Sequence, residues 1–491
     1  MSKPGNTPIV MKLEQNRKVM NERVGVDQSF DIGFRTLNLL NHEINLYYVT
    51  GLCETPIIVE LMRQLFEMNE LESESEKRSV FQQIKDEIPH QQVEVVPSIE
   101  KCITQLLSGL IVIFVQGETE AFIVDVRSYP GRTPEEPDTE KVIRGSRDGY
   151  TENIIENTAL TRRRIRDERL RHEIMQVGER SKTDICLSYI QDVADPGLVK
   201  LIKEEIKNIE IDGLSMADKT LEEFLVHQGR NPFPLVRYSE RPDVTAAHLF
   251  EGHVVIMVDT SPSMIITPTT YFHHVQHAEE FRQSPAVGTF VRWVRFFGIF
   301  ASVFLLPLWM LFVMQPDLLP AQLSFIGPNE ESTMPVIVQI LLADLGLEML
   351  RIAAIHTPTP LSTAMGLIAA VLIGQIAIDV GMFVPEVILY VAVSAIGSYA
   401  TPSYELSVAN KMSRVLLVIF VAIFGIKGFM IGMTLYIIIL AHTKSLNTPY
   451  LWPFLPFNAK AALQIVLRMS MPSLKVRPSI VHPQNNQRQR S

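Results

Sequence analysis

The stretch FFGIFASVFLLPLWMLFVM, residues 296–314, decides how this chain must be built. It is 19 residues long and carries no charge, and a helix needs about 20 apolar residues to cross the hydrocarbon core of a bilayer. Arg292 and Arg295 precede it, whereas the loop at 316–334 carries only acidic charges. Because basic residues favour the cytoplasmic side of a membrane, we expect the chain before this stretch to be cytoplasmic.

Charge divides the 491 residues into three parts. Residues 1–295 carry 34 basic against 46 acidic side chains, residues 296–440 carry 4 against 8, and residues 441–491 carry 7 against none. The charge-poor middle part has the composition of a membrane domain. The net charge of −9 argues against nucleic acid as a partner, since nucleic-acid-binding proteins are usually basic.

Further apolar segments follow the first one. We expect them at 335–355, 363–383, 385–401 and 415–440. The basic C-terminal tail favours a cytoplasmic C-terminus, so the number of crossings should be even. Either the segment at 335–355 does not span, or the one at 415–440 is bent or split. We expect about four spans and one polar or re-entrant helix.

The segment at 335–355 holds the candidate site. Asp344, Glu348 and Arg351 are spaced i, i+4 and i+7, so they share one helical face. Ionisable groups at membrane depth usually face a bundle interior or a water path. In an oligomer these acids could form a pore lining that favours cations. The alternatives are an internal pair of Glu348 with Arg351 and an interfacial helix, and Lys427 is a candidate charge partner.

The region before the membrane segments reads as two small α/β subdomains, because helical and strand-like patterns alternate. Five expected elements carry this interpretation: a helix at 54–68, a hairpin at 108–126, a helix at 153–176, a strand at 183–190 and a buried strand at 253–262. The expected organisation is a flexible tail at 1–30, subdomains at 31–145 and 146–291, a membrane domain at 292–442 and a basic tail at 443–491.

Four motifs contain residue types that can serve catalysis, metal binding or nucleic-acid binding. None of them predicts a catalytic, cofactor or metal site. Asp259, Ser261 and Ser263 spell the DxSxS pattern of a metal-binding strand end, but prolines block the helix that should follow. His273 and His277 have a usable zinc spacing, but no Glu-X-X-His pairing or cysteine completes a site nearby. The glycines at 145–149 lack the P-loop lysine. The arginine-rich run at 161–171 is interleaved with acids, which favours a solvated or subunit-contacting helix face. We therefore expect no enzyme.

Longer motifs give a more specific indication. They are GSRDGYTENIIENTALTRRRIRD (145–167), GERSKTDICLSYI (178–190), YSERPDVTAAHLFEGHVVIMVDTSP (238–262), LGLEMLRIA (345–353), LIGQIAIDVG (372–381) and NTPYLWPF (447–454). Together they resemble the A-subunit family of spore germination receptors, the GerA family, over about residues 30–460. The run from Val258 to Gln283 is most similar to a stage V sporulation branch of this family, with Thr260 and Ser239 where receptor subunits have Gly and Thr.

The resemblance implies a multi-pass protein of the spore inner membrane that acts in germination, with its N-terminal domain on the cytoplasmic, spore-core side. It implies a homo-oligomeric channel for monovalent cations, working with other spore membrane germination proteins and linked to the release of dipicolinic acid or ions. Gln339 and Ile340 depart from the richer acidic pattern of receptor subunits. The alternative is a non-conducting scaffold that organises a germination or dipicolinic acid release complex in the lipid membrane.

Overall fold

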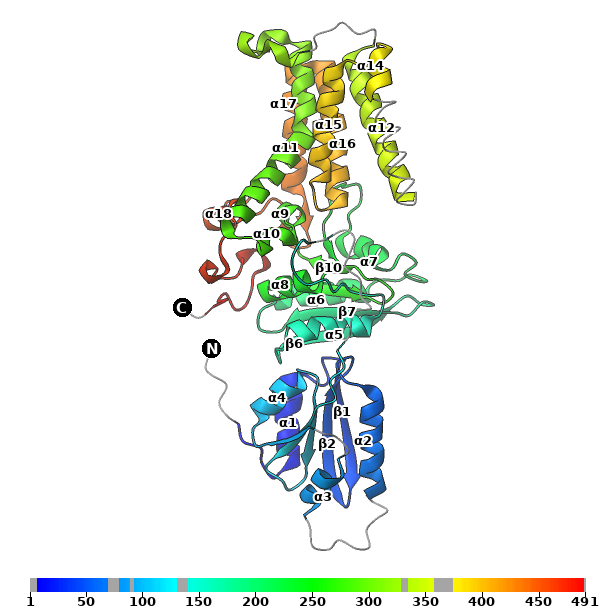
Figure 1. The fold of residues 1–491 in the computed structure, drawn as a ribbon, viewed down its shortest axis with the longest axis vertical. Coiled ribbons are helices and arrows are strands. Elements are labelled where there is room, and N and C mark those ends of the chain that lie inside the picture. Colours follow the sequence, from blue (N-terminus) through cyan, green and yellow to red (C-terminus); the bar gives the residue numbers. More distant parts are fainter. Residues whose placement is uncertain are drawn as a thin grey trace. The chain divides into compact units, whose positions relative to one another are not determined.

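The structure, a computed structural model, describes residues 7–68, 79–88, 92–129, 140, 142–327, 334–356 and 374–489. It contains two compact units (Figure 1). The first comprises Met1–His227, Val236–Pro268 and Leu474–Ser491, and the second comprises Gln228–Leu235 and Thr269–Ser473. The first unit holds two sheets with helices, and the second is mainly helical, with a small sheet of β11 (Lys444–Ser445) and β12 (Thr448–Pro449).

The first sheet has the strand order β1-β2-β4-β5-β3, with every neighbouring pair antiparallel. Its strands are β1 (Ile32–Leu39), β2 (His42–Val49), β3 (Val93–Val96), β4 (Ile111–Val115) and β5 (Ala121–Val124). Its helices are α1 (Leu13–Val24), α2 (Thr55–Glu67), α3 (Val80–Glu87) and α4 (Ile99–Leu106). The helix expected at 54–68 and the hairpin expected at 108–126 are confirmed as α2 and as β4 with β5.

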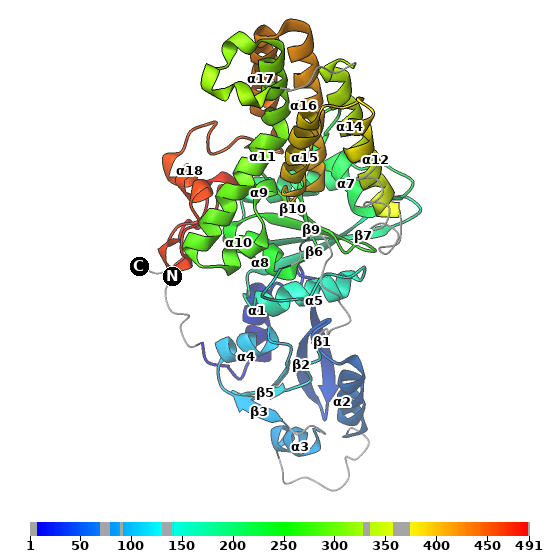
Figure 2. The same ribbon diagram turned by 45° about the horizontal axis from the view of Figure 1, so that its top comes forward.

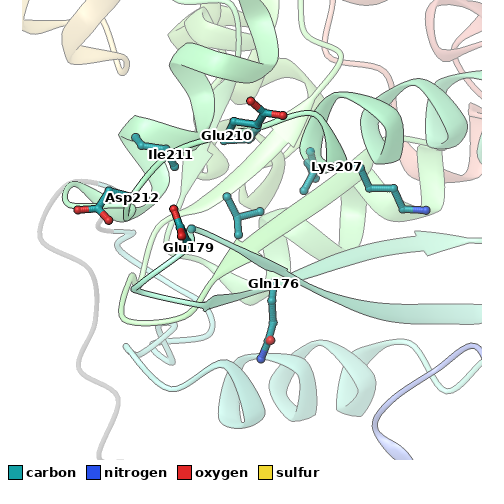
Figure 3. Close-up of a pocket in the computed structure, with 10 residues that line it drawn as sticks. Gln176, Glu179, Lys207, Glu210, Ile211 and Asp212 are labelled. Carbon is teal, nitrogen blue, oxygen red and sulfur yellow. The ribbon is translucent and has the colours of Figure 1, made fainter.

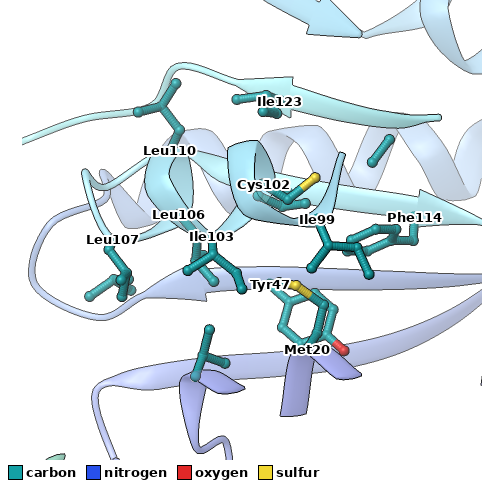
Figure 4. Close-up of a cluster of buried hydrophobic side chains, with 14 of the residues drawn as sticks. Met20, Tyr47, Ile99, Cys102, Ile103, Leu106, Leu107, Leu110, Phe114 and Ile123 are labelled. Atoms are coloured by element: carbon teal, nitrogen blue, oxygen red, sulfur yellow. The ribbon is translucent and has the colours of Figure 1, made fainter. Parts of the chain in front are cut away.

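The core of this subdomain forms where α1 and α4 cover one face of the sheet. Met20 of α1, Tyr47 of β2 and Cys102 of α4 are all fully buried in one cluster (Figure 4). The expectation of a flexible tail over 1–30 is therefore wrong for residues 13–24. Leu13, Met20 and Val24 lie on one helical face, and burying them against the sheet orders an otherwise polar segment.

The second sheet has the order β6-β7-β9-β10-β8 and is also antiparallel. Its strands are β6 (Leu170–Val177), β7 (Thr183–Ile190), β8 (Arg237–Ser239), β9 (Val254–Val258) and β10 (Met264–Thr267). Its helices are α5 (Ile154–Arg164), α6 (Pro196–Lys207), α7 (Ala217–Val226) and α8 (Pro242–Glu251). The predicted mixture of helices and strands is present in both subdomains, and all neighbouring strands in the two sheets are antiparallel.

The helix expected at 153–176 is wrong beyond Arg164, where α5 ends and the chain turns into β6. Arg162 closes this turn, since its guanidinium donates to the carbonyl oxygen of Leu170 at 3.2 Å. Pairing with β7 then fixes Leu170–Val177 as a strand. The arginine-rich run at 161–171 is thus divided between a helix end and a strand. The predicted strands at 183–190 and 253–262 are confirmed as β7 and β9.

The second unit is a group of apolar helices (Figure 2). The longer ones are α11 (Pro285–Met314), α12 (Val336–His356), α15 (Pro385–Tyr399), α16 (Tyr404–Phe424) and α17 (Ile426–His442). Among the described residues, α11 and α16 are long and apolar enough to cross a membrane, while α15 and α17 are shorter apolar helices. Pro307 lies inside α11 without ending it.

The apolar segment expected at 415–440 is split, which is one of the two alternatives to five full crossings. Gly425 separates α16 from α17 and adopts a φ of +59°, a backbone conformation that glycine accepts readily. The segment expected at 363–383 falls mostly on residues 357–373, outside the described residues. Its end contributes the short helix α14 (Ala377–Asp379).

Candidate functional site

Helix α12 turns its acidic side chains into the helical unit. Asp344 is only 5% exposed, whereas Leu345, Met349 and Ile352 on the same helix are among the exposed apolar side chains. The charged face predicted from the i, i+4, i+7 spacing therefore packs against other helices. The outward face of α12 is apolar, as expected for a helix surrounded by lipid or by other subunits.

Asp344 meets two basic residues of α16. Its carboxylate accepts a hydrogen bond from Nη2 of Arg414 at 2.6 Å, and Nζ of Lys411 lies 3.9 Å away. Arg414 is fully buried and also donates to the Ser302 carbonyl oxygen at 2.8 Å and to Ser394 Oγ at 2.6 Å. One guanidinium therefore joins α11, α12, α15 and α16.

Glu348 continues the same network. It pairs with Lys411 of α16 and with Arg351 of its own helix. The guanidinium of Arg351 lies over the Tyr404 ring, 4.8 Å from the ring centroid. The three predicted residues are thus brought together, and the internal pair of Glu348 with Arg351, weighed as an alternative to a pore lining, is present.

Lys427 has a different place. It is exposed in the first turn of α17. Among the described residues, the ion pairs of Asp344 and Glu348 are made with Arg351, Lys411 and Arg414. Sequence reasoning missed Lys411 and Arg414, because the span expected at 415–440 began just after them. Their i, i+3 spacing at the head of an apolar run was the available signal.

The network holds two acids and three bases, most of them largely buried. Removing charges from water is costly unless they are paired and hydrogen-bonded. The pairs meet part of this requirement and hold α12 against α16. The arrangement can therefore hold these helices together.

The side chains of the two possible metal-binding motifs make structural hydrogen bonds. Asp259 Oδ1 accepts from the Ile154 amide at 3.3 Å, and Ser261 Oγ donates to Asp218 at 3.1 Å. A strand, β10, follows them instead of a helix. Nδ1 of His277 accepts the amide N–H of Glu279 and caps α10 (Ala278–Arg282). No group of three or more potential metal ligands occurs in the described part of the chain.

A shallow hollow of about 500 Å³ lies beside the β6–β7 turn and the end of α6 (Figure 3). Glu179, Lys207, Glu210 and Asp212 lie around it. Asp212 is paired with Arg180 at 2.6 Å, and both side chains are exposed. Because its charged groups are solvated, this hollow does not indicate a binding site.

Comparison with known proteins agrees with the resemblance seen in the sequence. The model of the Bacillus/Clostridium GerA spore germination protein family matches residues 18–480. The chain belongs to the GerA family. It is a germination-related protein, and the motifs at 145–190, 238–262 and 345–381 lie inside the matched region.

Relatives within the GerA family include sporulation and germination proteins of Bacillus. Stage V sporulation protein AF of Bacillus subtilis is 61% identical over 475 residues, covering 97% of this chain and 96% of the relative. Spore germination protein B1 of the same organism is 30% identical over 402 residues, covering 80% and 82%. Spore germination protein KA is 26% identical over 488 residues, covering 98% and 89%.

A solved structure also matches. The N-terminal domain of the A subunit of the Bacillus megaterium spore germinant receptor GerK3 is 26% identical, with a TM-score of 0.43. The match covers 54% of this chain and 98% of that one.

Proposed function

We propose that this GerA-family chain is a multi-pass protein of the spore inner membrane and acts in germination as an ion-conducting subunit. Its sheet-containing unit would lie on the cytoplasmic, spore-core side. The names of its relatives support a role in spores. The apolar helices α11 and α16 support membrane insertion.

The network of five charged side chains among apolar helices carries this proposal. Groups such as Asp344 and Arg414 are expensive at membrane depth, and proteins keep them there mainly for ion or proton pathways. In this arrangement each acid is paired with a base, and the bases occupy the positions that a cation would take. We interpret this arrangement as the closed state of the proposed ion path. Conduction would require Lys411 or Arg414 to move away, so that a monovalent cation takes its place beside a carboxylate.

The proposal includes assembly. The exposed apolar face of α12, with Leu345 and Met349, suits contact with lipid or with another copy of the chain. We propose a homo-oligomer that works beside other spore membrane germination proteins, with dipicolinic acid or ion release as its outcome. We propose no catalytic role, and no nucleic acid as a partner.

A second function is a non-conducting scaffold of a germination or dipicolinic acid release complex. The pairing itself favours this alternative, because Asp344 and Glu348 are both bound within one chain. With three bases for two acids, the network is not an acidic ring. Under this proposal the ion pairs only fasten α12 to α16.

Cation flux through the purified protein in liposomes separates the two functions. The variant Asp344→Asn/Glu348→Gln is compared with wild type, and Asp379→Asn/Glu386→Gln removes two acids of the same unit outside the network. We expect flux from wild type and from the control variant, and a several-fold fall in the network variant. Absence of flux from well-folded wild type would favour the scaffold and lead to co-purification from spores. Loss of assembly in the network variant without any change in flux would contradict conduction along α12.

A further inference from the structure

Helix α18 (Ala459–Val466) has apolar side chains on both of its faces. Ala462 and Ile465 are buried against the second unit, while Leu463 is 51% exposed and Val466 is 37% exposed. A helix on a surface that faces water normally turns polar side chains outward. The outward face of α18 therefore has the composition of a contact surface.

The C-terminal end of α18 is closed by protein groups. An α-helix leaves its last four carbonyl oxygens without a partner in the helix. Here the Leu463 oxygen accepts the Leu467 amide at 2.8 Å. Arg292 Nη1 donates to the oxygens of Gln464 and Ile465 at 3.0 and 2.9 Å, and the indole N–H of Trp293 donates to the Val466 oxygen at 2.9 Å.

The N-terminal end carries a side-chain cap. The side chain of Asn458 accepts the amide N–H of Ala461 at 3.1 Å. Arg292, which closes the other end, is itself buried and paired with Glu280 at 2.7 Å. Unsatisfied backbone groups are what exclude an irregular or frayed segment from a lipid environment. With its C-terminal carbonyl oxygens satisfied and its N-terminus capped by Asn458, α18 can lie where water is scarce.

The apolar face continues onto the neighbouring elements. Arg292 and Trp293, the residues that close α18, belong to α11, the longest apolar helix described. Exposed apolar side chains also lie on α11 and on the chain just before α18: Phe290, Trp293 and Phe297, and Phe454, Leu455 and Phe457. Aromatic side chains concentrate in this way at membrane–water boundaries.

Charge agrees with a lipid surface. Lys460 is exposed on α18, one turn before Leu463. In the part of this unit that contains α18, residues 441–473 carry three basic side chains (Lys444, Lys460 and Arg468) and no acidic one. Basic segments next to a membrane helix are attracted to anionic phospholipids, and a short helix with an apolar face can lie in the plane of the interface.

We infer that α18 is an interfacial helix that lies on the cytoplasmic leaflet and binds anionic phospholipid, with Leu463 and Val466 in the acyl boundary and Lys460 at the phosphates. The inference rests on the proposed membrane insertion of α11. The bound partner is the lipid surface. A second copy of the chain or another protein in its place is an outcome of the test.

Fluorescence quenching by brominated phospholipids tests the inference on the full-length protein in vesicles. Three variants each add one cysteine that carries an environment-sensitive fluorophore. The added cysteines are Leu463→Cys on α18, Phe300→Cys in the middle of α11 and Glu210→Cys in the first unit. Wild type gives the background, since its three cysteines are buried. We expect strong quenching at 463 and 300 and none at 210.

Each other result has a distinct meaning. Quenching at 300 without quenching at 463 overturns the interfacial helix and leaves the membrane insertion in place. Absence of quenching at both overturns the insertion and the inference with it. A fluorophore at 463 that is shielded from both brominated lipid and aqueous iodide shows a protein on this face, which also overturns the inference.

A separate measurement tests the preference for anionic phospholipid. Quenching at 463 is compared in phosphatidylglycerol and phosphatidylcholine vesicles, with Lys460 intact and with Lys460→Glu. We expect roughly twofold stronger quenching in the anionic vesicles, and this gain should be lost in Lys460→Glu. Equal quenching in the two lipids would overturn the role of anionic phospholipid.

Discussion

At the scale of single residues, a buried ion pair joins the two sheets of the first unit. Arg162 of α5 donates to Asp31 at 2.9 and 3.1 Å, and both side chains are almost completely buried. Ser29 donates to Asp31 and accepts from Arg162, so the charges are held within a hydrogen-bonded network. Burial by itself would raise the pKa of Asp31, but Arg162 holds this pKa below its usual value.

Breaking this pair from one side should be severe. Asp31→Asn leaves the Arg162 charge buried without its partner, and we expect a loss of about 3–5 kcal/mol in the free energy of unfolding. Denaturant unfolding of the solubilised full chain measures it. The double variant Asp31→Leu/Arg162→Met removes both charges, and we expect a much smaller loss in its free energy of unfolding. Equal losses in the two variants would contradict an ion-pair role.

His172 makes the same region sensitive to acid. Burial lowers its pKa to about 3, from 6.5 in an exposed side chain. The folded state holds the imidazole neutral, while the unfolded chain binds a proton below pH 6.5. Its contribution to stability is therefore intact above that pH and is lost as the pH falls from about 6.5 towards 3.

The size of this effect follows from the pKa shift. At pH 5 wild type should have lost about 2 kcal/mol through His172 alone. Unfolding curves at pH 7 and pH 5 for wild type and His172→Gln measure it, and the variant should lose less stability over this interval. Parallel losses in both proteins would show that other groups account for the acid sensitivity.

At the scale of elements, close contact between backbones fixes the helices of the second unit. A Cβ added to Gly397 of α15 would lie 2.1 Å from the carbonyl oxygen of Gly298 in α11. Ser394, one turn earlier on α15, also hydrogen-bonds to the backbone of α11. Small residues at such a crossing allow the close approach that holds membrane helices together.

Two single glycine substitutions, one at the crossing and one as a control, test this contact. Gly397→Ala forces α11 and α15 apart, and we expect it to lower the free energy of unfolding by about 1–3 kcal/mol. Gly374→Ala is the control, because no atom of the described residues lies within 4 Å of a Cβ at that helical position. Alanine there should be neutral or slightly stabilising. Thermal unfolding in detergent measures both, and similar shifts would contradict the crossing.

At the scale of the whole molecule, the chain end returns to the first unit. Residues 474–491 belong to that unit, where Ile480 and Val481 are buried and Arg488 pairs with Glu251 at 3.1 Å. The basic tail predicted at 443–491 is therefore divided between the two units. Its final part is packed, and charge and apolar contacts both hold it.

A substitution at the packed tail shows its contribution. Val481→Asp places a charge in a fully buried position, and we expect a loss of about 2–5 kcal/mol together with rapid proteolysis of the tail. Val476→Asp, at an exposed position of the same tail, is the control. Limited proteolysis followed by mass spectrometry measures the difference. Equal cleavage of both variants would contradict docking of the tail.

The sequence by itself determined where apolar and charged residues fall along the chain. Patterns of local spacing were enough to predict α2, the β4–β5 hairpin, β7, β9 and the apolar run at 296–314, because each depends on residues close in sequence. The family motifs, also local, indicated a germination protein. The face shared by Asp344, Glu348 and Arg351 follows from helical periodicity alone.

The tertiary structure decided which charges meet. Arg162 pairs with Asp31, which lies 131 positions away in the sequence, and Arg414 pairs with Asp344, 70 positions away. No local pattern encodes such pairings, because they depend on how separate elements pack. For the same reason α1 is ordered by the sheet it covers, and Lys411 and Arg414, rather than Lys427, meet the acids of α12. Burial makes these contacts strong, and burial exists only in the folded chain.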